Sequence, residues 1–260
     1  MENGYTVLCL VLGGTRFMEH SRRSYIYPWF SIGMGIGGFF LQYWLFSNVE
    51  QGKLLPEYHL AGLFSVVLLF LVFMVNLVVL RHAPRVYEYE ELFPGSLIAA
   101  LGSALAAFGM GYAALDVGGA GVLELAVPVF GILSAAALLC AAYCRLSGKQ
   151  PSCLFHCVVL VYLLLRTISR YRTWGSLSQI ALYFFPLVAA LLLLLATYYR
   201  AELDIHTKNY KKYLFFSQAA LFCCFLCLVS EDWIFYLSAG LWIGTDYCVL
   251  PVYQGRHLEG

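Results

Sequence analysis

The stretch LFSVVLLFLVFMVNLVVL, residues Leu63–Leu80, contains eighteen consecutive residues without a charge. A helix of this length covers about 27 Å at 1.5 Å per residue, close to the ~30 Å hydrocarbon thickness of a bilayer. An open strand would leave its backbone N–H and C=O groups unpaired in hydrocarbon. The stretch is therefore predicted to be a transmembrane helix.

Seven further apolar stretches of similar length flank this one. The gaps between them hold at most ~15 residues, too few for a folded extramembrane domain. We therefore predict an all-α, polytopic transmembrane helical bundle of about eight spans, with residues 1–260 forming a single integral membrane domain. In chain order the predicted spans are Tyr27–Phe46, His59–Leu80, Gly95–Leu115, Gly121–Tyr143, Pro151–Tyr171, Leu177–Tyr198, Lys212–Val229 and Trp233–Val252.

The composition of the whole chain agrees with a lipid environment. Hydrophobic residues make up 61% of the chain and charged residues 12%, whereas a soluble domain is about a quarter charged. The mean hydropathy is +0.75. A formal net charge of +1 gives no electrostatic basis for binding nucleic acid, so membrane lipids are the expected surroundings.

Basic residues in the short loops predict the orientation. Cytoplasmic loops carry an excess of Lys and Arg, and twelve of the 16 basic residues fall on one side if both termini are cytoplasmic. Residues 1–24 then form a cytoplasmic N-terminal arm. This arm is either an interfacial or loosely ordered segment, or dispensable before Met18 if translation begins there.

Three of the four basic residues on the outer side lie together after the fifth span. From Pro151 to Leu165 a helix covers only about 22 Å, so it must continue past Arg166 to cross the bilayer. Tyr162, Arg166 and Arg170 are spaced by four and share one helix face. A cation at that depth costs about 3 kcal/mol on insertion scales, so Arg166 is predicted to be buried inside the bundle beside an acid.

Two interpretations of these arginines remain open. One is a structural ion pair, and the other is an outward-opening pocket that holds a carboxylate or phosphate. The candidate ligand-binding residues are Arg166, Arg170, Arg172 and Tyr162. The candidate acidic partners on that side are Asp116, Glu124, Glu231 and Asp232.

Small residues predict which helices pack closely, because they let backbones approach in lipid. The third span is the richest in Ala and Gly and is predicted to be the centre of the bundle. The bulky stretches 66–73 and 191–195 are predicted to face lipid. The glycines predicted to mediate helix packing are Gly33, Gly37, Gly102, Gly109, Gly240 and Gly244.

Signals for a cofactor are weak throughout the chain. Thiolates and imidazole can bind zinc, but cysteines four residues apart are also typical of a small apolar helix face. We predict no cofactor, and the weak candidates for a metal site are Cys140, Cys144, Cys153, His156 and Cys157. Asp246, within the eighth span, is expected either to contact a basic partner or to belong to an ion path.

Three short motifs carry a resemblance to a group of proteins. They are Tyr25-Ile26-Tyr27-Pro28, Phe93-Pro94-Gly95 and Tyr171-Arg172. In this eight-span layout the chain resembles uncharacterised multi-pass membrane proteins of anaerobic Gram-positive bacteria. The resemblance implies a location in the bacterial plasma membrane and brings no reaction with it.

Three functions follow from these features. The leading hypothesis is binding or translocation of a small anionic solute near the outer face. The second is a structural or accessory subunit, whose Gly-rich first or eighth helix docks a membrane protein partner. The third is a membrane-embedded enzyme acting on a lipid-linked substrate, although no convergent acid, base or nucleophile supports it.

Overall fold

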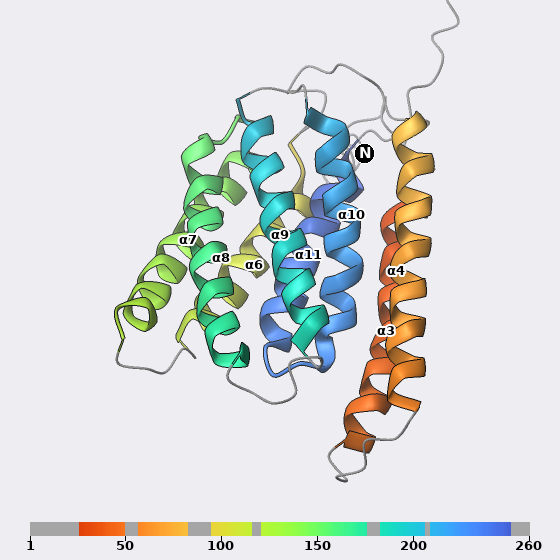
Figure 1. The fold of residues 1–260 in the computed structure, drawn as a ribbon. Coiled ribbons are helices and arrows are strands. Elements are labelled where there is room, and N and C mark those ends of the chain that lie inside the picture. The colour runs from red at the N-terminus through yellow and green to blue at the C-terminus, as the bar shows by residue number, and fades with distance from the viewer. Residues whose placement is uncertain are drawn as a thin grey trace, which may run out of the picture.

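The computed structural model describes residues 26–49, 57–82, 95–115, 121–175, 183–205 and 209–250. Every regular element within these ranges is a helix (Figure 1). A short 3-10 turn, Cys227–Val229, follows the seventh long helix. The long helices are α3 (Ile26–Val49), α4 (Glu57–His82), α6 (Leu97–Leu115), α7 (Val122–Leu146), α8 (Cys153–Gly175), α9 (Phe184–Leu203), α10 (Tyr210–Leu226) and α11 (Trp233–Val249).

Each long helix coincides with one predicted span, and six are long and apolar enough to cross a membrane. These six are α4, α6, α7, α8, α9, and α10 together with the turn that follows it. The all-helical, membrane-competent character predicted from hydropathy is thus confirmed. The N-terminal arm before residue 26 lies outside the described residues.

The boundary of α9 differs from the prediction. The helix begins at Phe184, whereas the sequence predicted a span from Leu177. Pro186 therefore lies in the first turn of α9. A backbone N–H at this position has no intrahelical acceptor, so proline costs no hydrogen bond there. It does not kink the middle of a longer helix.

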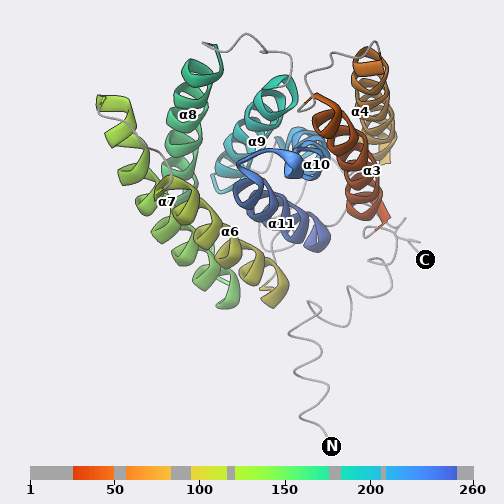
Figure 2. The same ribbon diagram turned by 90° about the horizontal axis from the view of Figure 1, so that it is seen from below.

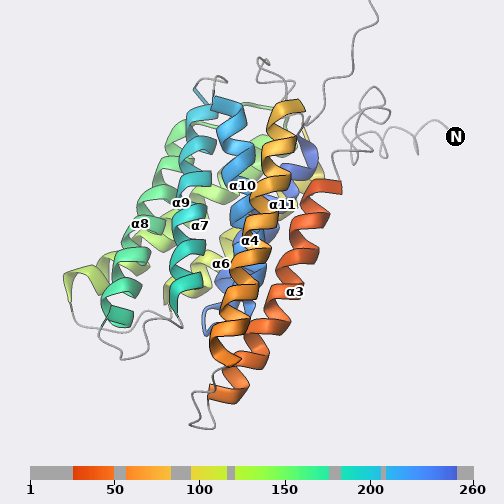
Figure 3. The ribbon, with the colours of Figure 1, turned by 45° about the vertical axis from the view of Figure 1, so that its right-hand side comes forward.

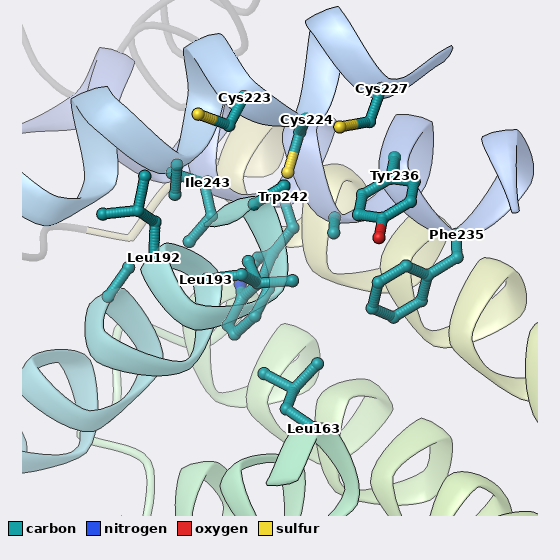
Figure 4. Close-up of a cluster of buried hydrophobic side chains, with 14 of the residues drawn as sticks. Leu163, Leu192, Leu193, Cys223, Cys224, Cys227, Phe235, Tyr236, Trp242 and Ile243 are labelled. Atoms are coloured by element: carbon teal, nitrogen blue, oxygen red, sulfur yellow. The ribbon is translucent and has the colours of Figure 1, made fainter. Parts of the chain in front are cut away.

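Helices α6 to α11 form a closed ring. Each contacts the next in chain order, and α11 returns to contact α6 (Figure 2). Side chains fill the middle of this ring. Figure 4 shows Leu163 of α8, Leu193 of α9 and Trp242 of α11 among the buried residues there. The ring is a packed core with ionic groups at its two ends.

The hairpin of α3 and α4 lies outside this ring and packs mainly on α10 (Figure 3). Gln42 of α3 donates a hydrogen bond to the Ser65 hydroxyl of α4 at 3.1 Å, which joins the two helices to each other. Asn76 of α4 donates to the backbone oxygen of Phe215 of α10 at 3.2 Å. A buried amide in hydrocarbon needs such partners.

The centre of the molecule is α10, not the third predicted span. Thirteen of its 17 residues are buried, because α9 and α11 cover one side and the hairpin covers the other. The prediction that residues 95–115 form the centre is therefore wrong. Small residues of α6 cover one face only, and the opposite face exposes bulky side chains to the surroundings, namely Leu101, Leu105, Phe108 and Tyr112.

Four of the predicted packing glycines lie at tight helix contacts. A Cβ on Gly102 or Gly109 of α6 would come within about 2 Å of the side chain of Thr245 or Ser238 of α11. A Cβ on Gly240 would lie 3.2 Å from Cys224 of α10. Gly244 likewise meets α10, through a leucine 3.2 Å away.

The prediction is wrong for Gly33 and Gly37 as contacts within this chain. A Cβ on either glycine would meet nothing within 4 Å, because both lie on the exposed face of α3. Gly35 and Gly38, on the opposite face, make the close approach to α10 instead. A helix carrying four glycines offers two possible faces, and neighbouring helices decide which one is covered.

Exposure also separates the two bulky stretches predicted to face lipid. Within residues 66–73 of α4 four side chains are exposed, as expected for a helix at the periphery, whereas Val72 is buried in the core. In α9, however, Leu192 and Leu193 are buried in the ring interior, so the lipid-facing prediction fails there. Bulky leucines fill a wide ring interior as well as they face acyl chains.

Candidate functional site

Two arginines of α8 and one aspartate form a buried ionic group, the Arg166 cluster, which consists of Arg166, Arg170 and Asp232. The Arg170 Nη2 atom lies 2.5 Å from Oδ1 of Asp232, and the Arg166 Nη2 atom lies 3.0 Å from the same oxygen. Arg166 is only 4% exposed. The spacing of four residues on one helix turns both guanidinium groups toward the ring interior, where Asp232 precedes α11.

Neighbouring helices hold Arg166 and Tyr162 in place. The Arg166 guanidinium donates to the backbone oxygen of Ala113 at 3.1 Å and lies 4.2 Å from the centre of the Phe235 ring. The Tyr162 hydroxyl donates to the backbone oxygen of Met110 at 3.2 Å. These contacts with α6 and α11 fix the cation in a desolvated position, where a cation–π contact contributes most.

Positive charge exceeds negative charge in the Arg166 cluster. Two guanidinium groups face a single carboxylate among the residues that the structure describes. The Arg170 Nε atom is buried and makes no hydrogen bond to a described residue. Nη2 of Arg166 also makes none, although it lies 3.0 Å from Asp232. Buried donors without acceptors are costly, so the cluster has the electrostatics of an anion site.

The other residues predicted for this site lie apart from it. Arg172 is exposed, since it is two positions beyond Arg170 and on another face of α8. Glu231 is exposed as well. Glu124 folds back toward Gly121 at the start of its own helix. Asp116 lies outside the described residues, so Asp232 is the only one of the four candidate acids that the structure brings to the arginines.

A second ionic group, the Asp246 cluster, lies at the opposite end of the ring, where α8 begins. It consists of Arg145, His156, Arg200, Asp204 and Asp246, from four helices and the cap of α9. The Asp246 carboxylate contacts Nη2 of Arg145 at 2.8 Å and Nε of Arg200 at 3.1 Å. Asp204 contacts Nη1 of Arg200 and Nδ1 of His156, both at 2.6 Å.

Aromatic side chains enclose the Asp246 cluster. The His156 ring is parallel to the indole of Trp242, with the ring centres 6.1 Å apart. The Tyr213 hydroxyl of α10 lies 3.4 Å from an Asp246 oxygen. Two arginines here face two aspartates, so this cluster is closer to neutrality than the Arg166 cluster and ties four ring helices together.

The charge on Asp204 is strongly favoured. Burial by itself would raise the pKa of this carboxyl, but Arg200 and His156 outweigh burial and lower the pKa to about 2. Asp204 follows the last turn of α9 and also accepts a hydrogen bond from Gln150 through its backbone oxygen, at 2.6 Å. The turn between α7 and α8 is therefore connected to the end of α9.

The weak metal candidates are not brought together. The sulfur atoms of Cys153 and Cys157 lie 3.6 Å apart, but Cys140 is exposed and His156 turns to Asp204. No group of three or more His, Cys, Asp or Glu side chains in the described ranges is placed to hold a metal ion.

Sequence reasoning anticipated a basic partner for Asp246 and missed the rest of that cluster. Arg145 and Arg200 are among the twelve basic residues that the charge bias assigns to the cytoplasmic side, and both are almost fully buried in the structure. A helical spacing was available as a signal, since Arg200 and Asp204 are four apart. Hydropathy places a charge near a span end but does not say whether it faces water or a neighbouring helix.

Comparison with known proteins gives no match, whether to a protein-family model, to a curated protein or to a solved structure. The ionic clusters therefore provide the basis for inferring function.

Proposed function

We propose that this membrane protein binds a small anionic solute, bearing a carboxylate or phosphate, at the Arg166 cluster. In this proposal all eight long helices cross a bacterial plasma membrane, both termini are cytoplasmic and the Arg166 cluster lies near the outer face. The twelve basic residues assigned to the cytoplasmic side support this orientation. The main support for anion binding is that the guanidinium groups of Arg166 and Arg170 share one carboxylate oxygen of Asp232.

The energetics of burial favour an anion at this position. Each cation inside a membrane costs about 3 kcal/mol on insertion scales, and such residues typically mark solute or ion pathways. One carboxylate offsets the charge of one arginine, and the second arginine remains in excess among the described residues. A bound anion would supply the missing charge and accept hydrogen bonds from the buried Arg170 Nε atom.

Exposure gives the two arginines different parts in binding. The side chain of Arg170 is 22% exposed and that of Arg166 is 5% exposed. An incoming anion thus meets Arg170 first and reaches Arg166 only within the ring. Arginine suits both positions, because its planar guanidinium group can donate two parallel hydrogen bonds to a carboxylate or phosphate.

The test is a binding titration of the purified protein in nanodiscs with acetate and with inorganic phosphate, at constant ionic strength. Arg170→Gln should weaken binding of the preferred anion at least tenfold, and Arg170→Lys should recover only part of it. Arg172→Gln is the matched control, because it removes the same charge from an exposed position two residues away. Equal effects of the two Gln variants would refute the site.

A further inference from the structure

We infer that Asp232 stands in the place of the solute's carboxylate, and that a small monocarboxylate binds by displacing Asp232 from the two arginines. This inference rests on the proposed function and deepens it in two respects. It names the solute class as small monocarboxylates. It also makes Asp232 a competitor of the solute for the two arginines.

The contact between Asp232 and the arginines is incomplete as an ion-pair network. A single oxygen of Asp232 meets both guanidinium groups, at 2.5 Å from Arg170 and 3.0 Å from Arg166. The Nη2 atom of Arg166 is close to this oxygen but is not aligned for a hydrogen bond. The backbone tether of Asp232 limits the angles that its carboxylate can reach. An untethered carboxylate with two free oxygens can align with both groups.

The position of Asp232 in the chain allows it to leave. It lies in the short connection between the turn after α10 and the first residue of α11. Local backbone hydrogen bonds hold this connection, from Ser230 to Cys227 and from Trp233 to Ser230. The backbone N–H of Tyr236 also donates to the backbone oxygen of Asp232 at 3.2 Å, so Asp232 caps α11. The two arginines, in contrast, project from a continuous helix of the ring. Displacement therefore requires movement of this turn and of the cap of α11, and it leaves α8, which carries both arginines, in place.

Charge selects a monoanion for this exchange. The two guanidinium groups exceed the single charge of Asp232 by one, so a monocarboxylate that binds them supplies the one missing charge while the displaced Asp232 stays at the edge of the cluster. The carboxylate of Asp232 is 10% exposed and becomes hydrated when it moves outward. A phosphate dianion would place two charges and a tetrahedral group where one planar group now sits.

The decisive variant is Asp232→Asn, which removes the competing charge at nearly constant volume. A tethered competitor acts at a high effective concentration and weakens the apparent affinity for any free ligand of the same chemistry. We expect Asp232→Asn to bind ¹³C-labelled acetate at least tenfold more tightly than the natural protein, measured by line broadening of the acetate signal in nanodiscs. Glu231→Gln, one residue earlier and exposed, should leave the affinity unchanged.

The outcomes separate the inference from the proposed function. In one outcome the natural protein binds acetate, Arg170→Gln abolishes this binding, and Asp232→Asn binds acetate no more tightly than the natural protein. The displacement inference is then overturned and the proposed anion site stands. If the natural protein prefers phosphate, the anion site again stands and the monocarboxylate class is wrong. If neither the natural protein nor a folded Asp232→Asn binds either anion, both ideas fail.

A second measurement does not depend on how the Asn variant folds. Displacement of Asp232 should loosen its turn, so a protease that cleaves after glutamate should cut the natural protein at Glu231 faster when acetate is present. Fragment masses identify the cut, and Arg170→Gln should abolish the acetate effect. Acetate-independent cleavage in the natural protein would contradict the inference.

Discussion

The aspartate at the centre of the Asp246 cluster should be the most costly charge to remove from this protein. Asp246→Asn keeps the size of the side chain but deletes the charge that faces Arg145 at 2.8 Å and Arg200 at 3.1 Å. Removing one partner of a buried ion pair typically costs about 3–5 kcal/mol, because the other charge stays buried. Since Arg145 and Arg200 both lose a contact with this carboxylate, while Arg200 keeps its contact with Asp204, we expect a cost of about 4 kcal/mol.

The free energy of unfolding can be measured by titrating the protein from mild micelles into SDS and following the loss of helix and tertiary signal. Glu124→Gln is the control, because it removes the same charge from a side chain that folds back on its own helix start. A double change, Arg145→Met with Asp246→Asn, should recover part of the loss, since one of the two buried cations that contact Asp246 is then removed. If Asp246→Asn lowers the free energy of unfolding by less than about 1 kcal/mol, the Asp246 cluster is not a buried ion-pair network that stabilises the fold.

Three further predictions concern packing, pH and topology. Gly131→Ala should destabilise the protein by about 1–3 kcal/mol, since its Cβ would lie 2.1 Å from an α6 side chain, whereas Gly37→Ala should be neutral in the same unfolding assay. The pKa of Asp204 is about 2 in the folded protein and ~3.9 in an unfolded chain. The ionised carboxylate therefore stabilises the folded protein fully above pH 4, and this contribution is lost as the pH falls through 2. Asp204→Asn should remove this dependence of the free energy of unfolding on pH. Labelling of single introduced cysteines in intact cells should find position 209 protected from an impermeant reagent and position 53 accessible, and the reverse pattern would invert the proposed orientation.

Hydropathy was sufficient to predict where the long helices lie but not how they face one another. Pattern and length located every long helix in the part of the chain that the structure describes, because hydrocarbon forces the backbone to pair within each segment. The order around the ring depends on which side of each helix is covered, and small residues alone do not decide this. The glycines of α3 and the leucines of α9 show the difficulty, because Gly35 and Gly38 make the contacts expected of Gly33 and Gly37, and two leucines expected to face lipid are buried.

The Arg166 cluster was more predictable than the Asp246 cluster for a physical reason. Arg166 lies well inside a span, so the cost of a lone cation in lipid predicts an acidic partner nearby. Arg145 and Arg200 lie at span ends, where a long side chain can equally reach water. Only the packing of the four neighbouring helices turns them inward.

The attachment of the α3–α4 hairpin through α10 has a consequence for biogenesis. The hairpin is made before the ring, and α6, α7, α8 and α9 must all leave the ribosome before its main partner, α10, is made. Throughout that interval the polar groups that α10 will satisfy, such as the amide of Asn76, must find other partners within the bilayer. A chaperone or insertase that shelters this hairpin until α10 arrives would therefore speed assembly without contacting the ring at all.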